Sequence, residues 1–233
     1  THGTLIIFSG YVMLLLSKVF AVLDVYTSCV IAILLTMLLS ILIYKVLIRP
    51  FMDSEVTVMI VTLVFALTVE QLIMYFNPRT RIVPNLVDGG VEILGITVVS
   101  QRVLGFIVAI VFIAGLWIFV KKTKLGKAIM ASSMDRTGCY LVGINAEQIQ
   151  FIVWGISGLL AGVGGIFLGS FSGVSPIAWR MPLLLSFCIV VLGGMGNIPG
   201  AMASAYLIGF TETIIAFQFS PKLRGIPSLI IVS

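Results

Sequence analysis

Two carboxylates lie inside long apolar runs of the chain, where an ionised group is costly and therefore points to function. They are Glu70 and Glu212. Gln71 beside the first, and Thr211 and Thr213 beside the second, are the expected hydrogen-bond partners. The alternative is that each carboxylate lies near a membrane face or bonds within a bundle. Neither has a carboxylate or histidine three or four positions away, which disfavours a proton relay.

The sequence contains none of the common catalytic or metal-binding motifs. The single histidine, His2, has no Ser/His/Asp, HExxH or Cys/His pattern around it. The glycine-rich segment Gly193–Gly200 (GGMGNIPG) lacks the lysine and hydroxyl residue of a phosphate-binding loop. Cys29, Cys139 and Cys188 are too scattered for a disulfide framework or a metal site. The sequence therefore predicts no enzyme, no metal site and no cofactor.

The elements that hold these residues are predicted to be transmembrane helices. Of the 233 residues, 60% are hydrophobic and 10% charged, against roughly 25% charged residues in soluble domains. At about 20 apolar residues per crossing, seven or eight spans fit. The net charge of +5 comes from basic residues between apolar runs, which indicates membrane anchoring rather than nucleic-acid binding. We predict an all-α, polytopic transmembrane helix bundle, with residues 1–233 as a single domain.

The apolar runs and the breaks between them predict the order of the spans. The runs are Leu5–Leu16, Ser28–Tyr44, Val56–Phe76, Val103–Val120, Phe151–Phe171, Pro182–Leu192 and Ala201–Phe219, with a further crossing from Ile226. Lys45–Glu55 is expected to be a short aqueous loop, and Asn77–Arg102 an exposed loop with a hairpin.

The polar segment Lys121–Glu147 is expected in the cytoplasm, because it contains the one dense basic cluster of the chain. Leu125–Met134 favours a short helix, Asp135–Gly138 a break, and Asn145 an N-cap of the following helix. Its apolar residues indicate a surface covered by a partner. They are Ile129, Met130, Met134, Leu141 and Val142.

Glycines are concentrated in two segments. Gly155–Gly173 contains spacings of the GxxxG kind, which favour close helix packing, although a solute passing along the backbone is the alternative. Pro182–Leu192 is too short for a straight span and continues into Gly193–Gly200. This pattern predicts a broken or re-entrant helix beside a cavity.

Three runs in order resemble the permeases of branched-chain amino-acid ABC transporters. Residues 123–150 (TKLGKAIMASSMDRTGCYLVGINAEQIQ) are similar to the coupling loop of that family. The glycine-rich helix GISGLLAGVGGIFLG with SGVSP, and then VVLGGMGNIPGAMASAYLIGFTE, follow in the family's order. His2-Gly3 resembles the second membrane segment, which implies that an N-terminal helix and part of the C-terminal tail lie outside this sequence.

The resemblance implies a multi-pass permease in the inner membrane of a prokaryote. Its implied partners are cytoplasmic ATPase subunits, a second permease (a copy or a relative), an extracytoplasmic solute-binding protein and the lipid bilayer. The expected ATPase-coupling residues are Gly126, Ala128, Asp135, Gly143, Ile144 and Asn145. The expected translocation path contains Gly193, Gly194, Gly196, Asn197, Pro199, Gly200, Glu70 and Glu212.

Three other functions stay open on the residues alone. An ion-driven secondary transporter would use Glu70 or Glu212 as its coupling group. A structural membrane subunit would need neither carboxylate. A sugar or nucleoside permease of the ABC type shares the same general architecture, and spacing does not distinguish its solute from an amino acid.

Overall fold

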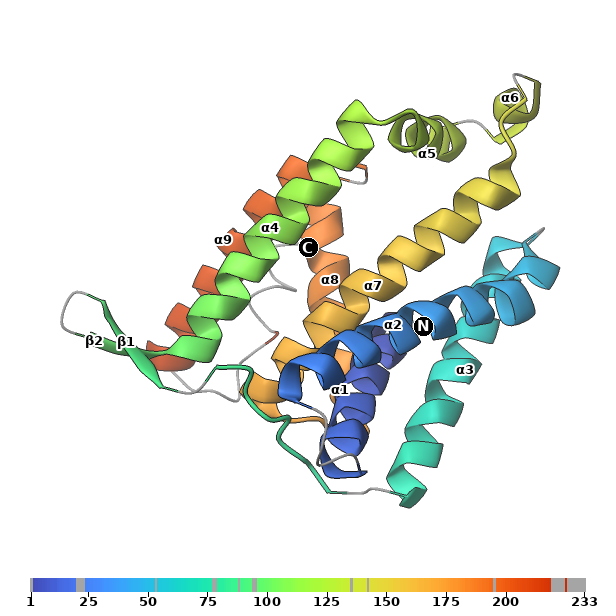
Figure 1. Ribbon diagram of the computed structural model, residues 1–233. Coiled ribbons are helices and arrows are strands. Elements are labelled where there is room, and N and C mark those ends of the chain that lie inside the picture. Colours follow the sequence, from blue (N-terminus) through green and yellow to red (C-terminus); the bar gives the residue numbers. More distant parts are fainter. Residues whose placement is uncertain are drawn as a thin grey trace.

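The chain is built almost entirely of helices in a computed structural model (Figure 1). The structure describes residues 2–19, 24–52, 54–76, 79–87, 89–93, 96–134, 136–141, 143–194, 196–218 and 225. In chain order the elements are α1 (His2–Val19), α2 (Val25–Ile43), the π-helix η1 (Tyr44–Ile48), the 3₁₀-helix η2 (Arg49–Phe51), α3 (Glu55–Phe76), β1 (Gly90–Ile93), β2 (Ile96–Val99), α4 (Ser100–Lys122), α5 (Lys124–Met134), α6 (Arg136–Leu141), α7 (Ala146–Ser172), α8 (Arg180–Gly193) and α9 (Ile198–Gln218).

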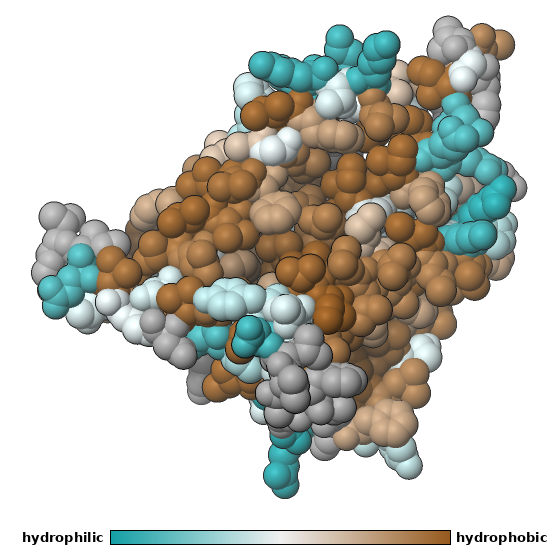
Figure 2. All heavy atoms as spheres, viewed as in Figure 1, coloured by the Kyte–Doolittle hydropathy of each residue, from teal (hydrophilic) through white to brown (hydrophobic). Residues whose placement is uncertain are grey.

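Within the described residues, five helical segments are long and apolar enough to cross a membrane. They are Val25–Phe51, Val56–Phe76, Ser100–Lys122, Glu147–Ser172 and Ile198–Gln218. Two shorter apolar helices, His2–Ser17 and Arg180–Gly193, complete the bundle. Figure 2 shows a broad apolar surface over the middle of the molecule, with hydrophilic residues gathered toward its ends. The predicted all-α polytopic bundle is confirmed, and the chain is a multi-pass membrane protein.

The centre of the bundle is α7, which packs against α1 and α2 through its glycines. A Cβ at Gly165 would collide with the carbonyl oxygen of Ile6 and the hydroxyl of Ser9. A Cβ at Gly158 would collide with Ser40 on α2. These positions let the helix backbones approach closely, as small residues do in membrane bundles. The predicted packing role of the glycine spacing is confirmed.

The prediction of an aqueous loop over Lys45–Glu55 is wrong. The helix of α2 continues through η1 and η2 to Phe51, so only a few residues connect it to α3. Pro50 lies in the first turn of the 3₁₀-helix, where its missing N–H removes no helical hydrogen bond. Charged and proline residues therefore do not end the helix here.

The predicted hairpin in Asn77–Arg102 is confirmed for its central part. The strands β1 and β2 pair antiparallel, with Gly90 opposite Val99. Ser100–Arg102, predicted as loop, already belongs to α4. The side-chain oxygen of Gln101 accepts the N–H groups of Leu86 and Val87 at 3.0 and 3.2 Å, which ties the connecting segment to the first turn of α4.

The later segments differ from the predictions in detail. Leu125–Met134 is helical, as α5, but Arg136–Gly138, part of the predicted break, lies in α6. The short helix α8 and the glycine turn before α9 agree with the predicted broken helix. The crossing predicted from Ile226 lies outside the described residues, as does Asp135.

Candidate functional site

The corner between α4 and α5 is rigidly built around Gly126. A Cβ at Gly126 would collide with the backbone of Phe119 and Val120 at the end of α4. The hydroxyl of Thr123 donates to the carbonyl oxygen of Phe119 at 2.7 Å and accepts the N–H of Gly126 at 2.9 Å. Only glycine fits this close approach of α5 to the end of α4. Ala128, also predicted as a coupling residue, is half-buried on α5.

The junction of α6 and α7 contains the other described coupling candidates. Gly143 has a φ of +77°, a left-handed conformation that favours glycine. The N–H of Ile144 donates to the carbonyl oxygen of Cys139 at 2.9 Å. The side-chain oxygen of Asn145 accepts the N–H groups of Glu147 and Gln148, so the predicted N-cap is confirmed. The loop segment thus has hydrogen bonds at the start of α7 as well as at the end of α4.

Between these anchors, α5 and α6 lie beyond the end of the long helices (Figure 1). They expose apolar side chains, namely Leu125 (45% exposed), Met130 (47%) and Leu141 (85%). Exposed apolar groups beside a basic cluster are typical of an interaction surface rather than of a solvated linker.

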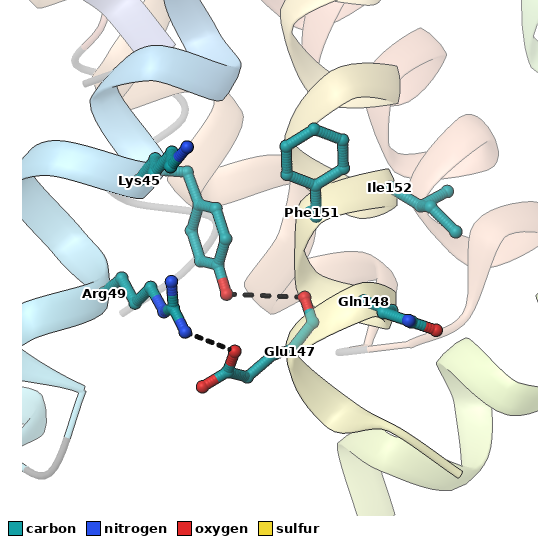
Figure 3. Close-up of a pocket in the computed structure, with 7 residues that line it drawn as sticks. Lys45, Arg49, Glu147, Gln148, Phe151 and Ile152 are labelled. Carbon is teal, nitrogen blue, oxygen red and sulfur yellow. Dashed lines mark hydrogen bonds and ion pairs between the residues drawn. The ribbon is translucent and has the colours of Figure 1, made fainter.

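A second polar site joins η1 and η2, which follow α2, to the start of α7 (Figure 3). A guanidinium nitrogen of Arg49 lies 2.8 Å from a carboxylate oxygen of Glu147, and both side chains are about half exposed. The hydroxyl of Tyr44 donates to the carbonyl oxygen of Glu147 at 3.5 Å. These residues line a cavity of about 400 Å³ together with Lys45, Gln148, Phe151 and Ile152.

The predicted path glycines form a tight turn between α8 and α9. Gly194 and Gly196 have φ values of +84° and +81°, and a Cβ at Gly200 would collide with the carbonyl oxygen of Gly193. The side chain of Asn197 accepts the N–H of Gly200 at 3.2 Å. The positive φ values and the close backbone approach favour glycine at these positions. The cavities at the α2–α7 junction, between α4 and α7, and beside Glu212 are lined by other residues.

Glu70 is buried in α3, with 4% of its side chain exposed, and it has two donors from the start of α8. The indole Nε1–H of Trp179 donates to Oε2 at 2.7 Å, and the guanidinium of Arg180 donates to Oε1 at 2.6 Å. The predicted partner, Gln71, is exposed instead. The carboxylate therefore joins α3 to α8, and its partners satisfy its charge.

Glu212 borders a cavity of about 590 Å³ between α7, α8 and α9. One carboxylate oxygen accepts the N–H of Gly225 at 2.9 Å. The hydroxyls of Thr211 and Thr213, predicted as its partners, donate to carbonyl oxygens of α9 instead. Ser172 and Ser175 also line the cavity, together with apolar residues such as Leu168 and Leu185.

The structure places the predicted sites in three parts of the molecule, one of which is the turn of Gly193–Gly200 between α8 and α9. The coupling residues Gly126, Gly143, Ile144 and Asn145 gather at the end of α4 and the start of α7. Glu70 and Glu212 approach the segment between α7 and α8 from two sides, at the opposite end of α7. In the part of the chain that the structure describes, no group of three or more His, Cys, Asp or Glu side chains could hold a metal ion.

Sequence reasoning missed Trp179, Arg180 and the pair of Arg49 with Glu147. One signal was present for Arg180, since it is the only basic residue between Glu147 and Lys222. A buried membrane carboxylate requires a cation or strong donors, so this isolated arginine was the natural candidate. The tryptophan carried no comparable signal.

Comparisons with known proteins place the sequence in a family. The family model described as "Branched-chain amino acid transport system / permease component" matches residues 1–232. The chain is 32% identical over 143 residues to the high-affinity branched-chain amino acid transport system permease protein BraD of Pseudomonas aeruginosa, which covers 61% of this chain and 47% of the relative. It is 29% identical over 143 residues to the corresponding protein LivH of Escherichia coli K12, covering 61% and 46%.

A ribose import permease protein, RbsC of Escherichia coli K12, is 35% identical over 112 residues, covering 45% of this chain and 35% of that protein. No solved structure matches the chain. The chain spans about half the length of the curated relatives it matches. The match over residues 1–232 identifies the chain as a member of the family of branched-chain amino acid transport permease components.

Proposed function

We propose that the chain is the membrane-spanning part of a permease subunit of an ATP-driven importer for branched-chain or chemically related amino acids. The observation that carries this proposal is the family match over residues 1–232. The transporter would lie in the cytoplasmic membrane of a prokaryote. Its partners would be ATPase subunits, a second permease subunit, and a solute-binding protein outside the membrane.

The ATPase would dock on α5 and α6. Leu125, Met130 and Leu141 supply exposed apolar area for that contact. The neighbouring basic cluster, Lys121–Lys127, supports a cytoplasmic position for this surface. A docking contact of this kind needs shape and apolar area, and no reactive group.

Movement of the ATPase would reach the bundle through two rigid connections. Gly126 fixes α5 to the end of α4, and Asn145 fixes the loop to the start of α7. Because α7 packs against α1 and α2, a displacement of α5 and α6 would tilt the centre of the bundle. This is a physical route from nucleotide-driven closure of the ATPases to alternating access. Ala128, Gly143, Ile144 and Asp135 complete the proposed coupling segment.

The solute path is assigned to the region between α7, α8 and α9. The cavity beside Glu212 combines a carboxylate and hydroxyls with apolar walls, which suits an amphipathic solute such as a branched-chain amino acid. The turn at Gly193–Gly200 would form the opposite part of the path, and Glu70 would border it through Arg180. Affinity would reside mainly in the solute-binding protein, so weak contacts here suffice.

The test is the ATPase rate of the chain reconstituted with candidate ATPase subunits and solute-binding protein, before and after leucine is added. We expect leucine to stimulate hydrolysis, and Leu141→Asp or Met130→Asp to abolish the stimulation. The matched control is Ile82→Asp, because Ile82 is 73% exposed and lies in the segment that bonds to the far end of α7. This control should keep full stimulation.

Two outcomes would contradict the proposal. Hydrolysis that ignores leucine but responds to ribose would assign the chain a sugar instead, as the similarity to a ribose permease makes testable. Leucine transport that continues without ATP and stops in the double variant Glu70→Gln, Glu212→Gln would indicate an ion-driven transporter.

A further inference from the structure

The cavity between η1, η2 and the start of α7 has both polar and apolar lining residues. Its polar residues include the phenol of Tyr44, the ammonium of Lys45 and the guanidinium of Arg49. Its apolar residues, Phe151 and Ile152, lie on α7 (Figure 3). Tyr44 and Lys45 lie in η1 and Arg49 in η2, so the continued helix places these polar residues opposite α7, whereas the sequence predicted Lys45 and Arg49 in a loop.

The depth of the cavity in the bilayer follows from the charges along α2. Asp24 and Lys45 are separated by the 20 uncharged residues from Val25 to Tyr44. At about 1.5 Å per residue these cover roughly 30 Å, the thickness of the hydrocarbon core. Lys45 and Arg49 therefore reach the headgroup region.

The wall from α7 has the same polarity gradient. Glu147 is the last charged residue before Arg180, so it marks the bilayer surface. Phe151 lies about one helical turn deeper, at the level of acyl chains, and is 44% exposed. The cavity therefore crosses the boundary between headgroups and hydrocarbon.

We propose that this cavity is a binding site for an anionic phospholipid. Lys45 and Arg49 bind the phosphate, with the phenol of Tyr44 beside them, and an acyl chain lies against Phe151 and Ile152. Basic pockets between membrane helices bind anionic headgroups through the same charges. The site is independent of the transport function proposed above, since it requires only the bundle and the bilayer.

The charges around the site are consistent with exchange of a phosphate for a carboxylate. Lys45 forms no ion pair among the described residues. Arg49 pairs with Glu147, but both side chains are about half exposed, and pairs of this kind contribute little stability. A lipid phosphate can therefore share or replace Glu147 as the partner of Arg49. The carboxylate of Glu147 repels the phosphate, so its removal should strengthen lipid binding, whereas removal of a cation should weaken it.

The experiment is native mass spectrometry of the full chain titrated with phosphatidylglycerol, and separately with phosphatidylcholine of the same acyl chains. The quantity compared is the dissociation constant of the first bound lipid. Each cation near the membrane surface contributes about 1 kcal/mol, or roughly fivefold in the dissociation constant. Lys45→Gln should therefore raise the dissociation constant for phosphatidylglycerol about fivefold, and the double variant Lys45→Gln, Arg49→Gln about 25-fold. Glu147→Gln should lower that constant. Phosphatidylcholine binding should change little in any variant.

The double variant Lys121→Gln, Lys122→Gln is the matched control, because these cations lie at the end of α4 and line no part of the cavity. Its first phosphatidylglycerol should bind as in the wild type. An equal loss in both double variants would reveal unspecific attraction and overturn the proposal, as would unchanged binding in the cavity variants. Displacement of the lipid by inorganic phosphate at equal concentration would assign the site to free anions instead.

Discussion

The indole nitrogen of Trp179 donates a 2.7 Å hydrogen bond to the carboxylate of Glu70, a residue 109 positions earlier in the chain. Arg180 donates to the other carboxylate oxygen, so two consecutive residues bind one buried acid. This arrangement fixes the start of α8 against α3. It also holds one wall of the cavity beside Glu212, since Met181 and Pro182 follow directly and line that cavity.

Removal of the cation from this arrangement should destabilise the bundle. Arg180→Met leaves the Glu70 carboxylate buried with the indole as its remaining donor among those described here. We expect a loss of about 1–3 kcal/mol in the free energy of unfolding, below the roughly 3–5 kcal/mol of a fully buried pair, because Arg180 is 59% exposed. Unfolding in mixed micelles, followed by circular dichroism, measures it.

Two further variants separate this explanation from a general effect of arginine loss. Adding Glu70→Gln to Arg180→Met removes the uncompensated charge and should restore part of the stability. Arg102→Met removes an exposed arginine that forms no ion pair among the described residues, and should be nearly neutral. Equal losses for Arg180→Met and Arg102→Met would disprove the structural role of the pair.

Adjacent glycines of α7 provide a test of the helix packing. Gly165→Ala places a methyl group against the carbonyl oxygen of Ile6, whereas Gly164→Ala meets no atom within 4 Å. We expect the first variant to lose about 1–3 kcal/mol of stability through overpacking, and the second to lose nothing. The same micelle unfolding assay compares them. If both variants unfold alike, the close contact of α1 with α7 is wrong.

Much of the fold was predictable because local rules determine it. Long uncharged runs must be helices in a bilayer, since every backbone polar group must be satisfied within the segment. Asn145 predicted the start of α7, whereas the glycines of the turn signal Asp88-Gly89-Gly90 lie at the start of β1, at the open end of the hairpin and not between its strands. The uncharged runs and the cap residue lie within a few residues of the structure that they determine.

The rest depended on contacts between distant segments. The partners of Glu70 come from α8, and its sequence neighbour Gln71 faces away from the bundle's interior. The helix extension through Lys45 and Arg49 was missed because charge and proline were taken as helix breakers. In the folded bundle, Glu147 of α7 supplies a partner for Arg49. Whether the glycines at Gly193–Gly200 border the solute path remains a prediction.

A single methyl group at the α4–α5 corner should loosen the proposed coupling segment. Gly126→Ala on α5 collides with the backbone of Phe119 and Val120, whereas Gly115→Ala, on α4, meets nothing within 4 Å. In the wild type the N–H of residue 126 donates to the hydroxyl of Thr123. If overpacking in Gly126→Ala destabilises this corner by about 1.4 kcal/mol, exchange of that amide should accelerate roughly tenfold. Hydrogen exchange read by mass spectrometry over residues 124–128 measures this. Equal exchange in both variants would contradict a rigid corner.

The N-cap at Asn145 should stabilise the start of α7, where the proposed coupling segment joins that helix. Asn145→Ala leaves the N–H groups of Glu147 and Gln148 without their side-chain acceptor, which costs about 1 kcal/mol. Exchange of these two amides should rise roughly fivefold, while Asn145→Ser, which keeps an acceptor oxygen, should stay close to the wild type. If coupling runs through α7, leucine-stimulated ATPase activity should fall in the alanine variant and persist in the serine variant. If exchange at Glu147 and Gln148 accelerates in the alanine variant while leucine still stimulates the ATPase fully, coupling would instead run through α4 alone.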